Sequence, residues 1–466
     1  MIRMTKLADI GRWLDDRLAT LTEQYKIPAV SVAVYAEGEV IDHAAGILNL
    51  ATGVEATTDS IFQIGSITKL WTATLVMQLA DEGLLDIDRP IREYLPEFQL
   101  GDESAAAVIT TRQLLSHTAG FEGDIFTDTG RNDDAIKLLI AGLGDVPQLF
   151  PPGEQFSYNN AGYCVLGRLV EVLREKPFNT ALRDHLITPL GLTRAATNAD
   201  EAIMFRAAVG HVQPEAGADY VPAPFWAMVY SNAPAGSMLT MRSRDLIAFA
   251  KMQMNGGVSD DGTVVLSPGV VSAMQERQVE LPYLGLLGDA WGLGWEIYDT
   301  PAGVIIGHDG STVGQNAFLR IAPKQGVAVA ILTNGGEPYG LYYELVTHIL
   351  AELAGVDLPA MPVPPAEPKN IDAGRFLGTY GNQMVDLDVT QDEEGRVWMT
   401  MTPKGVAEEL GEDAKTNELV WLRDDILIPL KGQQGMHMPH AFLGDDGTGR
   451  AQYLHIGRAV RRTEST

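Results

Sequence analysis

Residues 62–83 read FQIGSITKLWTATLVMQLADEG, a short polar segment followed by an apolar pattern that predicts a helix. Ser66 stands at the start of this helix and Lys69 one turn later, so the hydroxyl and the amine share a face. The positive end of the helix dipole and burial both disfavour the ammonium form of the lysine, which leaves its amine better able to act as a base. Alone, Ser-x-x-Lys is a weak signal, because an N-cap serine followed by a solvated lysine gives the same pattern.

Two further motifs strengthen the signal. Residues 151–160, PPGEQFSYNN, end a predicted loop just before an apolar helix pattern. There Tyr158 and Asn160 can project into a cleft, where the phenol can shuttle a proton to a leaving group and the amide can hold a substrate carbonyl. Residues 306–311, IGHDGS, leave a β-rich segment and offer His308 and backbone N–H groups at a strand edge. Each motif alone is compatible with ordinary turn chemistry, but the three together are difficult to produce by chance.

The three motifs resemble, in order, those of the penicillin-binding proteins and class C β-lactamases: Ser66-x-x-Lys69, Tyr158-x-Asn160 and His308-Asp309-Gly310. The resemblance covers residues 10–355 and implies a class C β-lactamase-like α/β fold. It implies Ser66 as nucleophile, Lys69 as its base and Tyr158 as proton shuttle, with His308 as a fourth catalytic residue. It also implies an oxyanion hole made by the backbone N–H groups of Ser66 and Ser311.

The third motif departs from the β-lactamase pattern. His308 stands where β-lactamases and peptidoglycan transpeptidases usually carry a lysine, and histidine there is the pattern of the esterase, aminopeptidase and acyltransferase branches. The first 21 residues also lack the unbroken apolar run of a signal peptide, which predicts a cytoplasmic protein. Both features count against peptidoglycan and β-lactams as substrates.

A narrower resemblance adds the C-terminal region. The histidine-type motif and a small C-terminal β domain together resemble the penicillin-binding-protein-type thioesterases, which cyclise nonribosomal peptides released from carrier-protein thioesters. We therefore expect head-to-tail macrocyclisation of a nonribosomal peptidyl thioester through an acyl-enzyme on Ser66. The expected partner is this peptidyl thioester or another small acyl substrate, and whether a carrier protein presents it is left open. The alternative within the superfamily is a D-amino-acid peptidase, amidase or esterase. A catalytically silent binding protein is the alternative of another class, but it would be expected to lose Ser66, Lys69 or Tyr158.

The chain divides at a proline-rich segment. Residues 1–357 are predicted to form the catalytic domain, an antiparallel sheet built from both ends of the domain, flanked by helices and interrupted by a helical region. Leucine and isoleucine recur at three- and four-residue spacing over residues 5–25, which predicts an amphipathic helix, and a closing helix is expected over residues 340–353. Residues 358–371 read as a stiff linker, since five prolines lie between positions 359 and 368. Residues 372–466 contain short β-type runs separated by turn residues, which predicts a small all-β domain, lipocalin-like by the same resemblance.

Composition excludes several classes of partner. The net charge of −27 argues against nucleic acid and anionic membranes, and no stretch reaches about 18 apolar residues. The single cysteine, Cys164, excludes an intrachain disulfide and makes a cysteine-based zinc site untenable. We expect no metal and no cofactor.

Four further sets of residues are ambiguous. Trp226, in APFWAMVY, is compatible with lining an acyl pocket and equally with a core position. His117 favours a structural role, because Lys69 already supplies the base. Three arginines between positions 458 and 462 read either as a solvated tail or as a carboxylate clamp in which Arg458 contacts substrate. Trp291 and Trp295 are expected to pack against the sheet.

Overall fold

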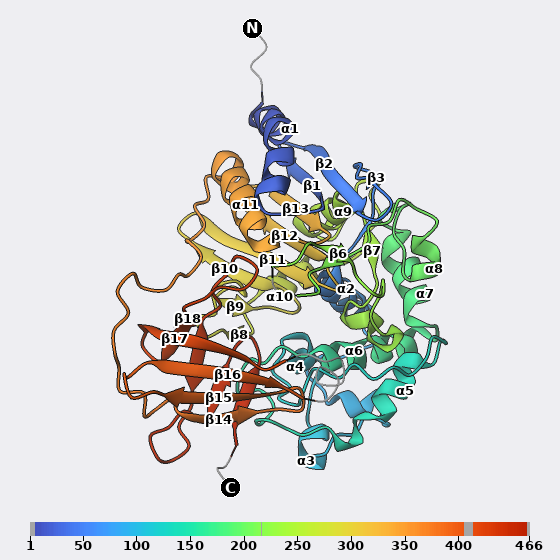
Figure 1. The fold of residues 1–466 in the computed structure, drawn as a ribbon. Helices are drawn as coiled ribbons and strands as arrows, with labels where there is room; N and C mark the ends of the chain where they lie inside the picture. The colour runs from blue at the N-terminus through green and yellow to red at the C-terminus, as the bar shows by residue number, and fades with distance from the viewer. Residues whose placement is uncertain (1–4, 216, 405–412, 464–466) are drawn as a thin grey trace.

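A nine-stranded antiparallel sheet forms the centre of the first domain in the computed structural model, which describes residues 5–215, 217–404 and 413–463 (Figure 1). Its strand order is β3-β2-β1-β13-β12-β11-β10-β9-β8, so the two ends of the domain meet where β1 pairs with β13. This confirms the predicted sheet built from both ends. The strands are β1 (Ala29–Ala36), β2 (Glu39–Asn49), β3 (Val54–Glu55), β8 (Val279–Glu280), β9 (Ala290–Trp291), β10 (Glu296–Thr300), β11 (Gly303–Ser311), β12 (Asn316–Ala322) and β13 (Val327–Thr333).

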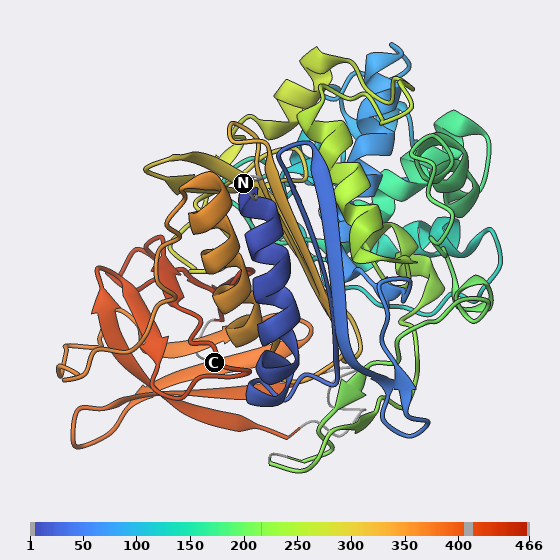
Figure 2. The same ribbon diagram turned by 90° about the horizontal axis from the view of Figure 1, so that it is seen from above.

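Two terminal helices cover one face of this sheet. Helices α1 (Lys6–Gln24) and α11 (Pro338–Ala354) lie side by side on it, whereas α9 (Ser243–Met254) lies on the opposite face (Figure 2). Alternation along β1 explains the two layers: Val30, Val32, Val34 and Ala36 join the cluster under α1 and α11, whereas Ala29 and Ala33 join the larger cluster on the other side. The predicted helices over residues 5–25 and 340–353 match α1 and α11 closely.

The region between β3 and β8 is mainly helical, as predicted. Its central helix, α2 (Thr68–Asp81), is buried nearly all round, and its apolar residues are accordingly not confined to one face. Around it lie α3 (Glu103–Ala106), α4 (Thr111–Leu115), α5 (Ala135–Ala141), α6 (Asn160–Arg174), α7 (Phe178–Leu182), α8 (Ala199–Ala202) and α10 (Pro268–Gln275). Two small ribbons complete the region: β4 (Phe62–Gln63) with β7 (Thr240–Met241), and β5 (His211–Val212) with β6 (Val221–Pro222).

The C-terminal region is a closed barrel of eight antiparallel strands, as the lipocalin-like prediction requires. No helix or strand occupies residues 355–377, the described segment that joins the two domains. The barrel strands are β14 (Gly378–Gly381), β15 (Val385–Gln391), β16 (Val397–Pro403), β17 (Lys415–Arg423), β18 (Ile426–Pro429), β19 (His440–Leu443), β20 (Tyr453–His455) and β21 (Ala459–Arg462). No helix of the described residues is both long and apolar enough to cross a bilayer.

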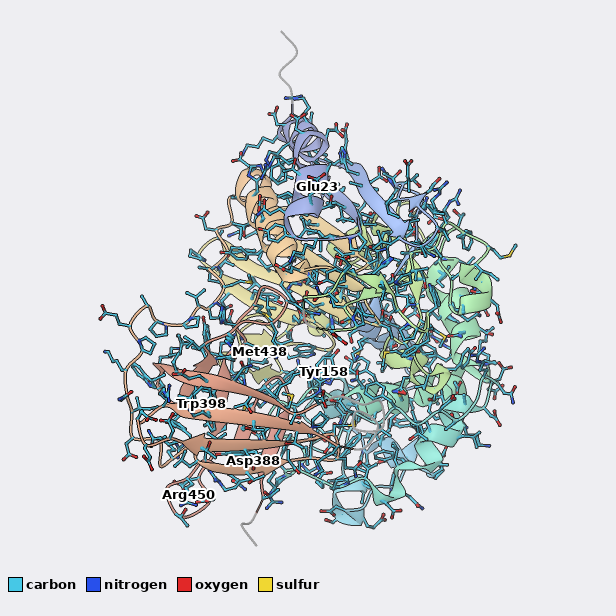
Figure 3. The ribbon with its side chains drawn as sticks, viewed as in Figure 1. Glu23, Tyr158, Asp388, Trp398, Met438 and Arg450 are labelled. Atoms are coloured by element: carbon cyan, nitrogen blue, oxygen red, sulfur yellow. The ribbon has the colours of Figure 1, made fainter. Side chains whose placement is uncertain are left out.

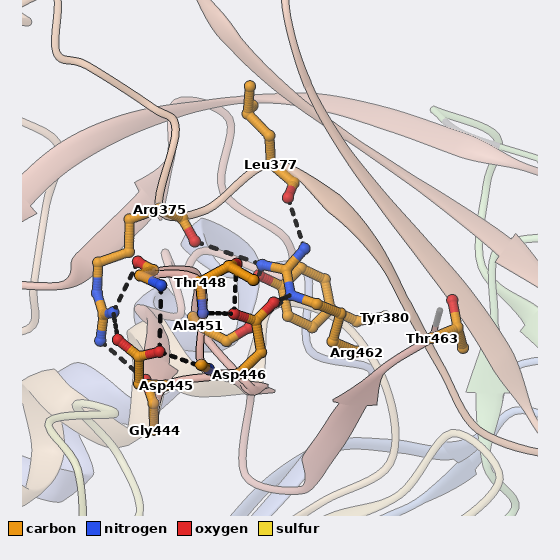
Figure 4. A network of polar contacts seen from close by, with 12 residues as sticks. Arg375, Leu377, Tyr380, Gly444, Asp445, Asp446, Thr448, Ala451, Arg462 and Thr463 are labelled. Carbon is orange, nitrogen blue, oxygen red and sulfur yellow. Dashed lines mark hydrogen bonds and ion pairs between the residues drawn. The ribbon is translucent and has the colours of Figure 1, made fainter. Parts of the chain in front are cut away.

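The last strand closes the barrel, which corrects the solvated-tail interpretation of residues 458–462. Strand β21 pairs with both β20 and β14. The Arg462 side chain crosses the seam, because Nη1 donates to the carbonyl of Leu377 at 2.6 Å and Nε to that of Ala451 at 2.7 Å (Figure 4). Its guanidinium also lies 4.6 Å from the centre of the Tyr380 ring. Arg461 is exposed, so the three arginines have three different environments.

Candidate active site

Ser66 lies in a 3₁₀ turn, Gly65–Ile67, between the short strand β4 and helix α2. A cavity of about 210 Å³ opens beside it. Five of the sequence-predicted residues line this cavity: Ser66, Tyr158, Asn160, Ser311 and Arg458. Apolar side chains from two residues that the sequence did not single out, Phe126 and Met228, also line it. The three motifs therefore meet at one cleft, although they are far apart in the chain.

Lys69 lies beneath the nucleophile and is fully buried. Its Nζ donates to Ser66 Oγ at 3.0 Å, to Asn160 Oδ1 at 2.7 Å and to the carbonyl of Ala235 at 2.6 Å. All three acceptors are neutral, so their hydrogen bonds replace only part of the lost hydration and none of them adds a negative charge beside the ammonium ion. Burial therefore lowers the pKa of Lys69 to about 7. At neutral pH a large fraction of Lys69 is then the neutral amine, which can accept the proton of Ser66.

Tyr158 completes the proton apparatus. Its hydroxyl is hydrogen-bonded to Ser66, and its ring centre lies 4.8 Å from the Lys69 amine. Burial raises the pKa of this phenol, so Tyr158 keeps its proton at neutral pH and can donate it to a leaving group. The imidazole of His117 packs on the phenol with ring centres 4.4 Å apart and accepts the Asn159 N–H at Nδ1. His117 thus supports Tyr158, in line with the structural role predicted for it.

Two glycines let the first and third motifs approach each other. A Cβ atom on Gly65 would lie 2.5 Å from the backbone nitrogen of Ser311, and one on Gly310 would lie 2.0 Å from the carbonyl oxygen of Ile64. Any side chain at either position would therefore separate the two segments. Their close contact places the backbone of Ser66 beside that of Ser311, which is the arrangement that the predicted oxyanion hole requires.

His308 lies behind Tyr158 and is not among the residues that line the cavity. Its Nδ1 is 2.6 Å from the carbonyl oxygen of Asp309, so Nδ1 carries the proton and Nε2 is the acceptor nitrogen. Burial and, to a lesser extent, the neighbouring Lys69 lower the pKa of His308 to about 3, so the imidazole is neutral. In this position it packs against Tyr158, with ring centres 6.3 Å apart, and against Trp291.

The barrel contacts the loop that carries Tyr158, which Figure 3 places between the two domains. The Tyr158 backbone N–H donates to the carbonyl of Gly457 at 3.1 Å, and the Ala459 N–H donates to Ser157 Oγ at 3.1 Å. The ring nitrogen Nε2 of His455 lies 2.8 Å from the Phe156 carbonyl oxygen. These contacts bring Arg458 to the cavity wall, where its guanidinium lies 5.1 Å from the Tyr158 ring centre.

Two sequence-based expectations need correction. Trp226 does not line the cavity, because its indole N–H donates to the Ala208 carbonyl at 2.9 Å and its ring packs in a separate cluster with Ile61 and Ala196. Asn160 was expected to hold a substrate carbonyl, but its amide bonds Lys69 on one side and Asp124 on the other. Sequence reasoning missed Asp124, since it lies outside every motif.

Comparisons with known proteins place this geometry in a family. The "Beta-lactamase" family model matches residues 14–352. The chain is 41% identical over 373 residues to "Penicillin-binding protein 4" of Amycolatopsis lactamdurans, a match that covers 80% of this chain and 97% of that relative.

Solved structures extend the likeness to the barrel. The crystal structure of SurE superposes with a TM-score of 0.76 at 29% identity, covering 98% of this chain and 99% of that one. A SurE structure with D-Leu gives a TM-score of 0.74. The D-amino acid amidase from Ochrobactrum anthropi SV3 shares the fold, with a TM-score of 0.63 at 22% identity over 74% of this chain and 99% of that chain. The chain belongs to the beta-lactamase family, and it is a serine hydrolase or acyltransferase of the penicillin-binding-protein type that carries a C-terminal barrel.

Proposed function

We propose that this protein is a standalone peptide cyclase of the penicillin-binding-protein-type thioesterases. It takes the acyl group of a peptidyl thioester onto Ser66 and releases it by attack of the peptide's own amine. The observation that carries this proposal is Arg458, a cation that the barrel contributes to the cavity beside the nucleophile. The match to SurE over both domains supports it, since SurE has the same two-domain plan.

The acylation step follows from the contacts of Ser66. The neutral amine of Lys69, 3.0 Å from Oγ, accepts the hydroxyl proton as Oγ attacks the acyl carbon. Charge then develops on the acyl oxygen beside the backbone of Ser66 and Ser311. The C–S bond breaks as the intermediate collapses, and the thiol leaves with a proton relayed by Tyr158, whose hydroxyl is bonded to Ser66.

Release runs the same steps with an amine. The peptide amine attacks the ester carbon, its proton passes to the base, and the C–O bond to Ser66 breaks as Oγ regains a proton. Attack by water instead would give a linear acid. The barrel contributes Arg458 to the wall of this cavity, and an amine that belongs to the bound peptide has a much higher effective molarity than a free amine. Arg458 can donate to a carbonyl or carboxylate oxygen of the residue that bears the amine.

The test uses synthetic peptidyl thioesters with a D-residue at the acyl end, chosen because a SurE structure contains D-Leu. We expect cyclic peptide to exceed linear acid when products are separated by liquid chromatography and mass spectrometry. Predominantly linear acid across several peptides would overturn the cyclase and favour the D-peptidase or esterase alternative.

The nucleophile is tested separately by intact-mass spectrometry. Ser66→Ala should form no acyl-enzyme, whereas Ser104→Ala, which removes an exposed hydroxyl, should acylate at the wild-type rate. A covalent adduct that forms on Ser66→Ala at the wild-type rate would contradict the proposed chemistry as a whole.

A further inference from the structure

Asp124 joins the general base to the barrel through a continuous series of hydrogen bonds. Its Oδ1 accepts from Asn160 Nδ2 at 2.7 Å and from Arg458 Nη2 at 3.2 Å, and its Oδ2 accepts from Arg458 Nε. Asn160 in turn accepts from Lys69 Nζ at 2.7 Å. The series therefore runs from helix α2, through the start of α6 and the loop after α4, to the residue that precedes β21.

Asp124 occupies only one edge of the Arg458 guanidinium. The Nε and Nη2 atoms are bonded to Asp124, and within the described residues Nη1 has no hydrogen-bond partner. Because Arg458 also lines the cavity, Nη1 is the nitrogen that remains for a substrate oxygen. A guanidinium held along one edge presents its other edge in a fixed direction.

We propose that Asp124 is a positioning residue that holds Arg458 at the cavity wall and Asn160 against Lys69 at the same time, and that its charge balances that of Arg458 at the general base. This inference rests on the proposed acyl-transfer function, because it concerns the amine that activates Ser66. The barrel then does more than cover the cleft: it supplies one half of an ion pair whose other half is bonded to the base network.

The two charges act on Lys69 in opposite directions. Burial is the largest influence on the pKa of Lys69; among the charged neighbours, Arg458 lowers this pKa and Asp124 raises it. Glu122, a buried carboxyl whose pKa burial raises to about 7, faces Asp124 from the same loop. Among the residues that the structure describes, the other titratable groups around this network are Tyr158, Tyr163, Cys164, His117, His308 and Lys404.

The experiment measures the pH dependence of Ser66 acylation in single turnovers, with thiol release from a synthetic peptidyl thioester as the readout. The acid limb is the part of the pH–rate profile in which the rate falls as Lys69 becomes protonated. Asp124→Asn should move this limb to lower pH by about one unit, and Arg458→Gln should move it to higher pH by about the same amount. The double variant should return close to the wild-type limb, since both charges are removed together. Asp128→Asn, which removes an exposed carboxylate of the same loop, and Arg461→Gln, which removes an exposed guanidinium of the barrel, are the matched controls and should leave the acid limb in place.

Several outcomes would overturn the proposal. The first is a shift of the acid limb in the same direction in both single variants. The second is an acid limb that Asp124→Asn leaves at the wild-type pH. The third is a double variant whose acid limb lies further from the wild-type limb than that of either single variant. If Asp124→Asn folds poorly by circular dichroism, Asp124→Glu replaces it: this variant keeps the charge and should keep the wild-type limb. If the acid limb disappears in Glu122→Gln, the group whose protonation produces the limb is Glu122 and not Lys69, and the proposal is overturned. Thiol release reports acylation whether the product is cyclic or linear, so failure of the cyclase leaves this test intact.

Discussion

Among the described residues of the catalytic domain, one lysine and one arginine, Lys69 and Arg320, are buried, and their surroundings are opposite. Lys69 is fully buried among neutral acceptors, the hydroxyl of Ser66, the amide of Asn160 and a backbone carbonyl. Arg320, on β12, is 1% exposed and lies between two carboxylates: Nη1 is 2.7 Å from Asp309 Oδ1 and 3.6 Å from Glu296 Oε2.

The difference shows how partners decide what a buried cation can do. Burial disfavours the charge of both and is the largest single influence on each, but at Arg320 the neighbouring groups, Asp309 foremost, together outweigh it and raise the pKa of the guanidinium. At Lys69 nothing outweighs burial, and the pKa falls to about 7. Arg320 is thus a permanent charge that holds Asp309, next to His308, in place, whereas Lys69 is a base. Contact with a carboxylate is therefore what distinguishes the structural cation, Arg320, from the catalytic one, Lys69.

Removal of the catalytic cation should have the largest effect. Lys69→Ala should lower turnover by about 10²- to 10⁴-fold, because Ser66 loses its proton acceptor. The melting temperature should fall less than after removal of Arg320, since the removed amine leaves only neutral acceptors without a donor and no buried carboxylate. Kinetics and thermal unfolding measure the two effects, and Lys251→Ala, which removes a lysine paired with Asp260, is the control. Parallel loss of activity and stability would mean that Lys69 is structural after all.

Removal of the structural cation should give the opposite result. Arg320→Met should lower the free energy of unfolding by about 3–5 kcal/mol, because it leaves two buried carboxylates without compensation. Urea unfolding at neutral pH measures this loss. Arg89→Met, which removes an exposed partner of Glu93, should change the stability by less than about 1 kcal/mol. Stability equal to the control would show that the ion pair around Arg320 contributes no more than a surface pair.

The smallest expected effect is a pH dependence that only one of the two cations produces. The neutral amine of Lys69 is the active form, so activity should be present above pH 7 and lost as the pH falls through the pKa of about 7. Below that pH the acylation rate should fall about tenfold per unit. Recovery of activity on return to pH 8 excludes unfolding as the cause. An acid limb that persists in the residual activity of Lys69→Ala would contradict this assignment.

The sequence predicted the fold best where a long pattern repeats. The helix over residues 5–25 and the strands at both ends of the sheet follow from periodicity that packing enforces. Strands β8 and β9 contain two residues each, too few to show alternation. Strand β21 was missed because three arginines within five residues are typical of a solvated tail, whereas Arg462 finds its partners in carbonyl groups more than ten residues away.

The site was predictable wherever a motif defines it. The spacing of Ser66 and Lys69, and the pair Tyr158 and Asn160, led to side chains that the structure brings together. Asp124 could not be found this way, since its two partners lie 36 and 334 residues away in the chain. Roles that arise only from contact between distant segments leave no local pattern in a single sequence.

The hydrogen bond between Tyr158 and Gly457 links main-chain atoms of the catalytic domain and the barrel, and this has an evolutionary consequence. A main-chain hydrogen bond depends on backbone position and is indifferent to which side chains the barrel carries. The sequence of the barrel can therefore change without loss of its contact with the loop that carries Tyr158. Arg458 and Ser157, in contrast, act through their side chains and cannot be exchanged for other residues. Selection on this enzyme should act on the path of the barrel backbone and on a few side chains at its rim, while most of the barrel surface changes without effect.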